Sequence, residues 1–432
     1  MGMGTQIDHQ PDAGELRAPG GWRVLAPFQY REYRLLIAAV AILVLAEGMW
    51  TVVMTLQVIA LDDDPTSLSL VATCLGVGLL AFILVGGIAA DRCQQRAIII
   101  LVEAMNFATV TTVAVLGLTG QLRLWQMAVA AFLMGVGAAF FFPAYSAYLP
   151  RILPAQQLLA ANGVEGAMRP TLEQAIGPAV AGVLIGATFP VLGSVTVAAL
   201  LGIALVLLIA TRPVQGPQAR DTERPHVLAD LRDGLRFVAR TGWLLWTVLY
   251  GSIFVLLVVG PIDVLLPFIA RERFEHGEQM YGFVLAAFGI GSALGALAVS
   301  SRRLPRRYLT VMMMMWGPGA LPLIVVGWTH SFTVMAVAVF VVGVTDGAGS
   351  VIWGTLLQRR VPPAMLGRIS SLDFFVSLAF LPLSMAVAGP LSKVVSMQTI
   401  FLVAGIAPFL LAGVAYLAAR MPRDELAHPL HW

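Results

Sequence analysis

Acidic residues within long apolar runs are the side chains of this sequence best suited to chemistry. Seven lie in or beside such runs: Glu47, Glu103, Glu165, Glu173, Asp263, Asp346 and Asp373. A carboxylate at the centre of a bilayer costs about 2.5–3.5 kcal/mol on insertion scales, so each needs a function or a partner. Because burial favours the neutral form of a carboxyl group, such residues can bind a proton in one state and release it in another.

Glu47 and Asp346 are the two acids placed deepest in their apolar runs. Glu47 has Trp50 on the same helical face and no arginine nearby in the sequence. Asp346 lies within 343–349, a segment whose three glycines permit close approach of another helix or local unwinding. We predict proton or substrate coupling for both acids. The alternative for each is a hydrogen bond that only holds helices together.

Glu165, Arg169 and Glu173 are spaced four residues apart, so on a helix they share one face and can form ion pairs. Glu173 is too far from the outer end of its run to reach water there. Pro170 removes a backbone hydrogen bond and can bend the helix toward a central cavity. We predict that Arg169 exchanges between Glu173 and a proton or an anionic group of the substrate. A static buried pair is the alternative.

Two further acids receive less specific predictions. Asp263 lies between Pro261 and Pro267 near the outer end of its run, where it could latch an external gate or pair with Arg271 at the interface. Glu103 is expected to have a structural role. Aromatic residues that could line a cavity are Trp50, Phe141, Tyr145 and Trp353.

The composition indicates that these acids belong to a membrane protein. Of the 432 residues, 58% are hydrophobic and 12% are charged, whereas a soluble domain has about 25% charged residues. The arginines occur in short groups rather than in a basic stripe with aromatic residues, so nucleic acid is not an expected partner. We find no nucleotide-binding loop, metal cluster or nucleophile–base pair, and Cys74 and Cys93 suggest no disulfide. No enzyme activity, metal or cofactor is predicted.

A helix needs about 20 mostly apolar residues to cross the hydrocarbon core, and this rule gives twelve spans. They are 35–60, 68–90, 97–118, 125–148, 167–187 and 191–211, then 244–269, 281–300, 309–328, 332–356, 369–391 and 398–419. Apolar residues at helical spacing in the connection between the two sets predict an amphipathic surface helix. The predicted domains are a tail at 1–27, a six-helix bundle at 28–211, a linker at 212–242, a second bundle at 243–420 and a tail at 421–432.

The placement of basic residues predicts the topology. With the N-terminus inside, cytoplasmic segments contain 22 of the 27 lysine and arginine residues, as the positive-inside rule requires. Both termini and the linker are therefore expected in the cytoplasm, with the protein in the plasma (inner) membrane. The first span starts too far from Met1 for a cleavable signal peptide, so we expect it to be retained.

The loop between the second and third spans has a recognisable pattern. Gly87, Asp91, Arg92 and Arg96 match the signature loop that the major facilitator superfamily has at this place, and 300–307 is a basic echo of it in the second half. The resemblance implies an all-α membrane protein with two pseudo-symmetric six-helix halves. It also implies that the loop acts as a conformational latch, docking through Asp91 and Arg92 beside Asp373 at the start of the eleventh helix.

Several other stretches are similar to the enterobactin-exporter and macrolide-efflux branch of this superfamily. They are 142–150, 159–163, 177–182, 233–238, 281–296 and 366–371. Gly177-Pro178 resembles part of the antiporter motif, although Glu173 and Gln174 replace the small residues usual before it. The resemblance implies a monomeric drug:proton antiporter of the multidrug-resistance type, embedded in membrane lipid, that exports amphipathic small molecules such as drugs or siderophore-like compounds by alternating access. A lipid or lysolipid flippase and a proton-coupled metabolite symporter are the alternatives.

Overall fold

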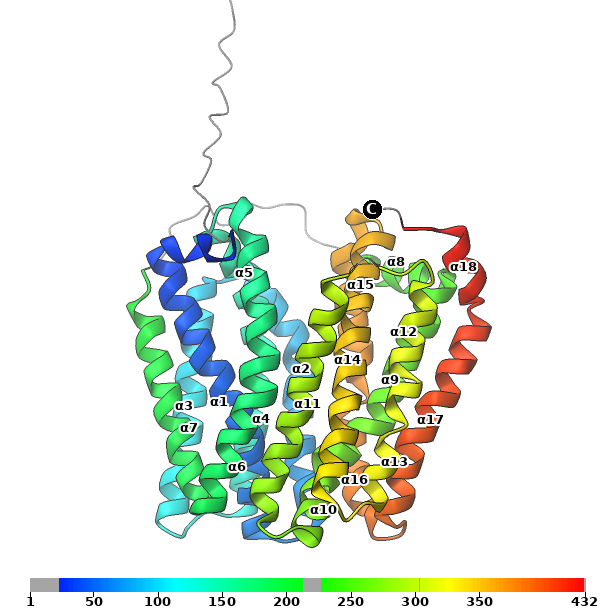
Figure 1. The fold of residues 1–432 in the computed structure, drawn as a ribbon. Coiled ribbons are helices and arrows are strands. Elements are labelled where there is room, and N and C mark those ends of the chain that lie inside the picture. Colours follow the sequence, from blue (N-terminus) through cyan, green and yellow to red (C-terminus); the bar gives the residue numbers. More distant parts are fainter. Residues whose placement is uncertain (1–22, 213–226, 303, 431–432) are drawn as a thin grey trace, which may run out of the picture.

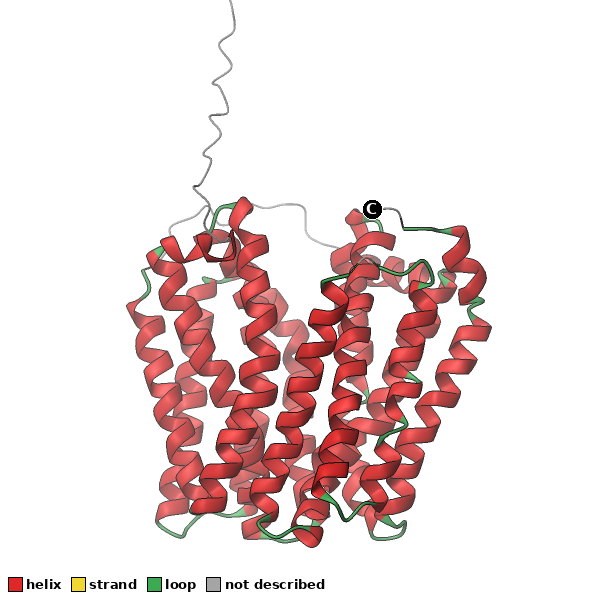
Figure 2. Ribbon diagram, in the orientation of Figure 1, coloured by secondary structure: helices red, strands yellow, loops and turns green. Residues whose placement is uncertain are grey.

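The computed structural model describes residues 23–212, 227–302 and 304–430, and within these ranges the regular structure is entirely helical (Figure 1, Figure 2). The protein is an all-α integral membrane protein. Eleven helices of the described chain are long and apolar enough to cross a membrane. The helical stretch 155–187, which carries Glu165, Arg169 and Glu173, lies in the bundle beside these eleven helices. Its position is consistent with a twelfth span.

The first half follows the predicted spans closely. After the short η1 (Arg23–Gln29), its helices are α1 (Arg31–Leu61), α2 (Pro65–Arg92), α3 (Gln95–Leu118), α4 (Leu124–Ile152), α5 (Ala155–Met168), η2 (Arg169–Ile176), α6 (Gly177–Ala187) and α7 (Pro190–Ala210). The segments α5, η2 and α6 follow one another without a break; they include the predicted fifth span, 167–187, and begin twelve residues before it.

The second half repeats this plan. Its helices are α8 (Val227–Arg240), α9 (Gly242–Gly260), η3 (Pro261–Leu265), α10 (Leu266–Arg273), α11 (Gly277–Ser300), α12 (Tyr308–Trp316), η4 (Pro318–Ala320), α13 (Leu323–Trp328), α14 (Phe332–Arg360), α15 (Pro363–Ala379), α16 (Leu381–Ser392), α17 (Met397–Ala418) and α18 (Met421–Ala427). The amphipathic helix predicted in the linker is α8, which packs against α9 and α15. Of the predicted C-terminal tail, α18 is ordered against α12.

Prolines divide several spans into segments that the sequence pattern did not predict. Pro170 lies in η2 and Pro261 begins η3, and both segments are π-helical. Proline has no backbone N–H for the regular helical ladder, and π-helical segments arise where that ladder is disturbed. Pro382 follows the break between α15 and α16. Four of the predicted acids lie in divided spans, namely Glu165, Glu173, Asp263 and Asp373, whereas Glu47, Glu103 and Asp346 lie in continuous helices.

The two ends of the described chain lie on the same face of the bundle. We call this face, which carries η1, α8 and α18, the terminal face, and the opposite face, which carries the loop 62–64 and the loop 393–396, the distal face (Figure 1). The two halves converge toward the distal face and diverge toward the terminal face. Leu101 and Leu417, on the outside of the bundle, are 72% and 73% exposed, as side chains in contact with lipid would be.

Glycine contacts bring backbones of the two halves together near the distal face. A Cβ added at Gly282 of α11 would lie 2.5 Å from the Pro178 carbonyl oxygen and 2.9 Å from the Cα of Gly182 in α6. On the other side of the interface, the backbone N–H of Gly389 in α16 donates to the Ser69 hydroxyl in α2 at 2.7 Å. The distal interface therefore consists of α11 against η2 and α6, and of α16 against α2.

Candidate functional site

The predicted charge series in the first half forms one connected group. Arg169 Nε is 3.2 Å from Glu165 Oε1, and Arg169 Nη1 is 3.3 Å from Glu173 Oε2. The guanidinium also lies over the Phe142 ring, 5.0 Å from its centroid, in cation–π geometry. Arg169 is thus shared almost equally between two carboxylates and an aromatic face. The ion pairs predicted from the spacing are present.

Local backbone geometry places this group beside Glu47. Arg169 and Glu173 lie in the π-helical η2, while Glu47 lies in α1. Gly48 has no side chain to separate the helices: a Cβ there would overlap the Glu173 carbonyl, and one at Gly177 would lie 2.8 Å from the Gly48 backbone. The Glu47 carboxyl group accepts no hydrogen bond from any described residue, but it is within electrostatic range of both Arg169 and Glu173.

Glu103 of α3 extends this group away from the central axis. Its side chain is buried, one carboxyl oxygen has no hydrogen-bond partner, and its charge interacts with that of Glu47. Arg96 does not contact it. This group therefore consists of four acids, Glu47, Glu103, Glu165 and Glu173, and one arginine, Arg169. Such an arrangement can bind and release protons, but it lines neither of the two cavities described next.

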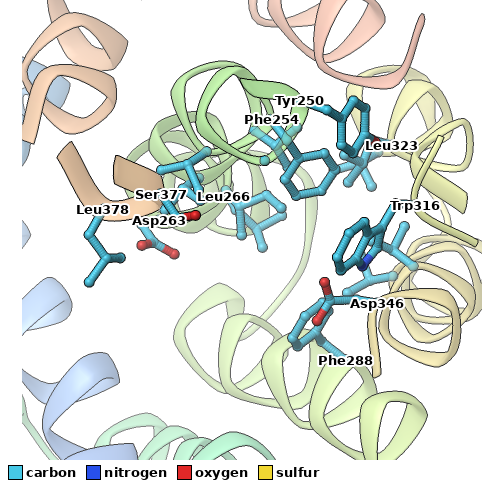
Figure 3. Close-up of a pocket in the computed structure, with 18 of the residues that line it drawn as sticks. Tyr250, Phe254, Asp263, Leu266, Phe288, Trp316, Leu323, Asp346, Ser377 and Leu378 are labelled. Atoms are coloured by element: carbon cyan, nitrogen blue, oxygen red, sulfur yellow. The ribbon is translucent and has the colours of Figure 1, made fainter. Parts of the chain in front are cut away.

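The second half encloses an apolar cavity of about 510 Å³ (Figure 3). Its wall combines aliphatic residues with aromatic side chains from different helices: Tyr250, Phe254, Phe288, Trp316, Trp353 and Phe401. Tyr250 and Trp316 are stacked with ring centroids 6.3 Å apart, and Trp316 and Trp353 are 6.4 Å apart. Cavities of about 300–1,000 Å³ with mainly apolar walls and a few polar groups are typical small-molecule sites.

Three carboxyl groups reach this cavity. Asp373 has partners: its carboxylate accepts from Trp353 Nε1 at 3.0 Å and from the Ser377 hydroxyl at 3.4 Å. The carboxyl groups of Asp263 and Asp346 accept no hydrogen bond from the described residues and form no ion pair with them. In Figure 3 these two lie on opposite sides of the cavity, Asp263 near Leu266 and Asp346 below Trp316.

Of the two roles predicted for the glycines around Asp346, close helix approach and local unwinding, the structure has the first, since α14 is continuous. A Cβ at Gly343 would overlap the Phe288 carbonyl of α11, and one at Gly347 would overlap the Ser292 carbonyl. At Gly349 a Cβ would overlap the Trp316 indole. Asp346 is therefore held on a helix whose neighbours fit directly against its backbone.

The four aromatic candidates are in different surroundings. Trp353 lines the large cavity, and Trp50 lines a second cavity of about 150 Å³ between the halves, where Asp263 and Tyr281 also lie. Phe141 and Tyr145 are instead buried within the first half, stacked on each other with centroids 5.8 Å apart. Tyr250 and Trp316 could not be identified from the sequence, because aromatic residues are common in apolar helices. Only their convergence on the cavity distinguishes these two from the others.

Ion pairs at the distal face connect the two halves and were not predicted. Arg271 contacts Asp63 at 2.6 Å, and Lys393 contacts Asp64 at 2.6 Å. The hydrogen bond from Lys393, together with the backbone N–H of Thr66, lowers the pKa of Asp64. Asp263 does not pair with Arg271. The run of three aspartates at 62–64 was the available signal, since the predicted topology places it on the same face as Arg271 and Lys393.

Among the described side chains of the signature loop, none forms a hydrogen bond or an ion pair with the second half in this conformation. Arg96 binds within its own half, donating to the Thr211 hydroxyl at 2.9 Å and to the carbonyls of Ile209 and Thr211. Arg92 is exposed, and a Cβ at Gly87 would meet nothing within 4 Å. The side chain of Asp91 lies outside the described part of the structure. The latch that the sequence predicts therefore stays a prediction for a conformation in which the terminal face is closed.

The sequence profile described as the Major Facilitator Superfamily matches residues 36–380. The multidrug efflux pump Tap of Mycolicibacterium fortuitum is 29% identical over 83% of this chain and 88% of its own length. Macrolide efflux protein A of Streptococcus pyogenes is 22% identical, covering 76% of this chain and 82% of its own. Enterobactin exporter EntS of Escherichia coli O1:K1 / APEC is 24% identical over 79% and 80%.

Solved structures show the same fold. The nucleoside transporter NupG superimposes with a TM-score of 0.70 at 15% identity, covering 90% of this chain and 99% of its own. A bacterial homolog of the human lysosomal transporter Spinster has a TM-score of 0.64 at 14% identity, covering 91% and 97%. Among the described residues, no group of three or more His, Cys, Asp or Glu side chains could hold a metal ion.

Proposed function

Because the chain belongs to the major facilitator superfamily of membrane transporters, we propose that it exports amphipathic small molecules from the cytoplasm across the plasma (inner) membrane in exchange for protons. The two halves alternate access to a central substrate path. Relatives named for multidrug, macrolide and enterobactin export support the direction. The apolar cavity with a few carboxyl groups supports an amphipathic substrate.

The observation that carries proton exchange is the position of Arg169 between two carboxylates at 3.2 and 3.3 Å. An unpaired charge in the membrane interior is costly. When a proton neutralises Glu173, Arg169 keeps Glu165 as its partner, so no isolated cation is left behind. When the proton leaves, the pair re-forms. Glu47, within electrostatic range of Arg169, provides a second proton position beside it.

The asymmetry between the two faces supports alternating access. Ion pairs and backbone contacts join the halves at the distal face, whereas the halves diverge at the terminal face (Figure 1). The basic residues of the linker and the short loops support a cytoplasmic terminal face. In this assignment the structure is the inward-open state, and the distal pairs must separate before substrate can leave outward.

The test is drug accumulation by proteoliposomes under imposed pH gradients. Ethidium, a permanent cation, and chloramphenicol, which is uncharged, serve as probes because a pH gradient does not trap either one. Molecules with the terminal face outward should accumulate at least one probe when the lumen is acidic, and an ionophore that collapses the gradient should stop this. Accumulation only with an alkaline lumen would indicate symport and overturn the proposal. Gradient-independent flipping of a fluorescent lysolipid without drug accumulation would indicate a flippase.

Variants of the charge series distinguish a proton site from a static pair. Glu173→Gln should leave the protein folded and shift the pH dependence of transport, because Arg169 keeps only Glu165. The double variant Arg169→Gln with Glu173→Gln removes both charges, so a static pair would tolerate it. Normal, pH-responsive transport by the folded double variant would show that this pair has no coupling role.

A further inference from the structure

We propose that the cavity of the second half is the substrate-binding site and that it selects lipophilic organic cations, with Asp346 as the residue that pairs with the positive charge. The proposal rests on the proposed export function only for its physiological meaning. The binding chemistry follows from the cavity itself: its net charge, its aromatic wall and the absence of a protein partner for Asp346 among the described residues.

The charge of the cavity has one sign. Asp263, Asp346 and Asp373 reach it, and none of its lining residues in the described structure is a lysine, arginine or histidine. Asp373 is satisfied by Trp353 and Ser377, whereas Asp346 has no such partner. Leaving a carboxylate unpaired in apolar surroundings is unfavourable, and a bound cation would supply the missing partner. An anionic ligand would add repulsion to its own loss of water.

The aromatic wall provides the second recognition element. Trp316 lies between Tyr250 and Trp353, with centroids 6.3 and 6.4 Å away, and Figure 3 shows Asp346 adjacent to Trp316. Faces of tryptophan and tyrosine attract cations, and the attraction is stronger where water is excluded. A planar or aryl-substituted cation can therefore place its charge near Asp346 while its apolar groups contact the rings. Neutral and anionic molecules gain only the second contribution.

Asp346 is held in place before any ligand binds. The glycines at 343 and 347 bring α11 against the backbone of α14, and Gly349 receives the Trp316 indole. A carboxylate on such a rigid helix needs little reorganisation on binding, which favours affinity and selectivity. Asp263 lies on the opposite wall and also lines the smaller cavity between the halves. It offers a second pairing position toward the interface between the halves.

The proposed cation site is separate from the charge series of the first half. Glu47, Arg169 and Glu173 line neither cavity, so the proton and the substrate bind to different halves. Coupling then operates through the movement of the halves, not through competition for one carboxylate. Glu275 is an exposed acid that lines neither cavity, so Glu275→Gln removes one negative charge elsewhere and is a matched control that should leave cation binding unchanged.

The experiment measures binding of two ions with the same shape and opposite charge, tetraphenylphosphonium and tetraphenylborate, to the purified full-length protein in detergent. Radiolabelled tetraphenylphosphonium is measured by scintillation proximity, with unlabelled competitors. The wild type should bind tetraphenylphosphonium and be competed poorly by tetraphenylborate. Asp346→Asn should weaken binding by about 10- to 100-fold, since it removes the charge pair but not the rings. Asp346→Glu should bind within a few-fold of the wild type, and the control Glu275→Gln should bind as the wild type does.

Equal binding of the two ions by the wild type would overturn the proposal. This comparison needs no variant, so it does not depend on whether a variant folds. Unchanged affinity in an Asp346→Asn protein of normal thermal unfolding would also overturn it. The two proposals fail separately. Charge-selective binding through Asp346 without gradient-driven accumulation of either drug would refute proton-coupled export alone, and export without charge selectivity would refute the cation site alone.

Discussion

Gly282 offers a direct test of how the distal interface sets the conformational equilibrium. It lies in α11 against Pro178 and Gly182 of the other half, and a Cβ there would be 2.5 Å from the Pro178 carbonyl oxygen, where ordinary contact needs 3.4–4 Å. The obstructing atoms belong to the backbone and cannot rotate away. Gly282→Ala should therefore separate the two helices in the distal-closed state and cost nothing in a distal-open state.

The size of the effect follows from the cost of overpacking. Inserting a methyl group into a tight interface costs about 1–3 kcal/mol. Since about 1.4 kcal/mol is a factor of ten in an equilibrium constant, the ratio of distal-closed to distal-open molecules should fall about 5- to 150-fold. The higher helix propensity of alanine, about 1 kcal/mol, stabilises the helix in both states and cancels from this ratio.

Two spin-label pairs can measure this shift in a protein in which Cys74 and Cys93 are replaced by serine. Labels at Gln121 and Glu275 report the distal face, and the distance between them should lengthen in Gly282→Ala. Labels at the terminal-face positions Pro154 and Arg306 should approach each other at the same time.

Two glycine variants serve as controls for the substitution itself. Gly413→Ala, where a Cβ meets nothing within 4 Å, should leave both distributions unchanged. Gly291→Ala overlaps Phe340 within the same half, so it should lower thermal stability without shifting the distributions. Unchanged distances in Gly282→Ala would refute the reasoning.

Three other predictions concern the distal pairs, the packing of the first half and the latch. Pairing with Lys393 lowers the pKa of Asp64. The pair should therefore stabilise the distal-closed state at pH values above the ordinary aspartate pKa of about 3.9, and this stabilisation should be lost as the pH falls through the lowered pKa. The distance between the distal spin labels should lengthen over that pH range, and the same response in Asp64→Asn would contradict the prediction. Arg96→Ala removes three hydrogen bonds to the end of α7 and should lower stability by about 2–4 kcal/mol in thermal unfolding, with no change indicating that they contribute nothing. Asp91→Asn should abolish transport and leave ligand binding intact, and transport at the wild-type rate would dismiss the latch.

The span plan could be read from the sequence because long apolar runs and the arginine distribution report directly on the membrane. The predicted spans coincide with helical stretches to within a few residues, except the fifth, whose helix begins twelve residues earlier than predicted, and α8 lies where its apolar spacing indicated. The divisions at η2 and η3 were beyond the pattern, since a proline in a span can bend, break or widen a helix depending on its neighbours. The sequence indicated where the disturbance is and left its form open.

Contacts between residues close in the sequence could be predicted, whereas contacts between distant segments could not. The pairing of Arg169 with Glu165 and Glu173 depends on spacing within one helical stretch, and it is present. The cavity brings Tyr250, Trp316 and Asp346 together from α9, α12 and α14, and no sequence spacing encodes that convergence. The distal pairs join residues more than two hundred positions apart. Their signal was topological and could only place the charges on a common face.

The central claim is that Glu173 and Arg169 exchange a proton for the exported compound. The most direct test is to measure the proton movement that substrate transport causes. Proteoliposomes with a pH-sensitive dye in the lumen start without a pH gradient, and potassium with valinomycin removes any membrane potential. Ethidium added outside should enter through molecules with the terminal face outward while protons leave, so the lumen should become alkaline. Glu173→Gln should take up ethidium without this change. Ethidium uptake by the wild type with a constant lumenal pH would contradict the account.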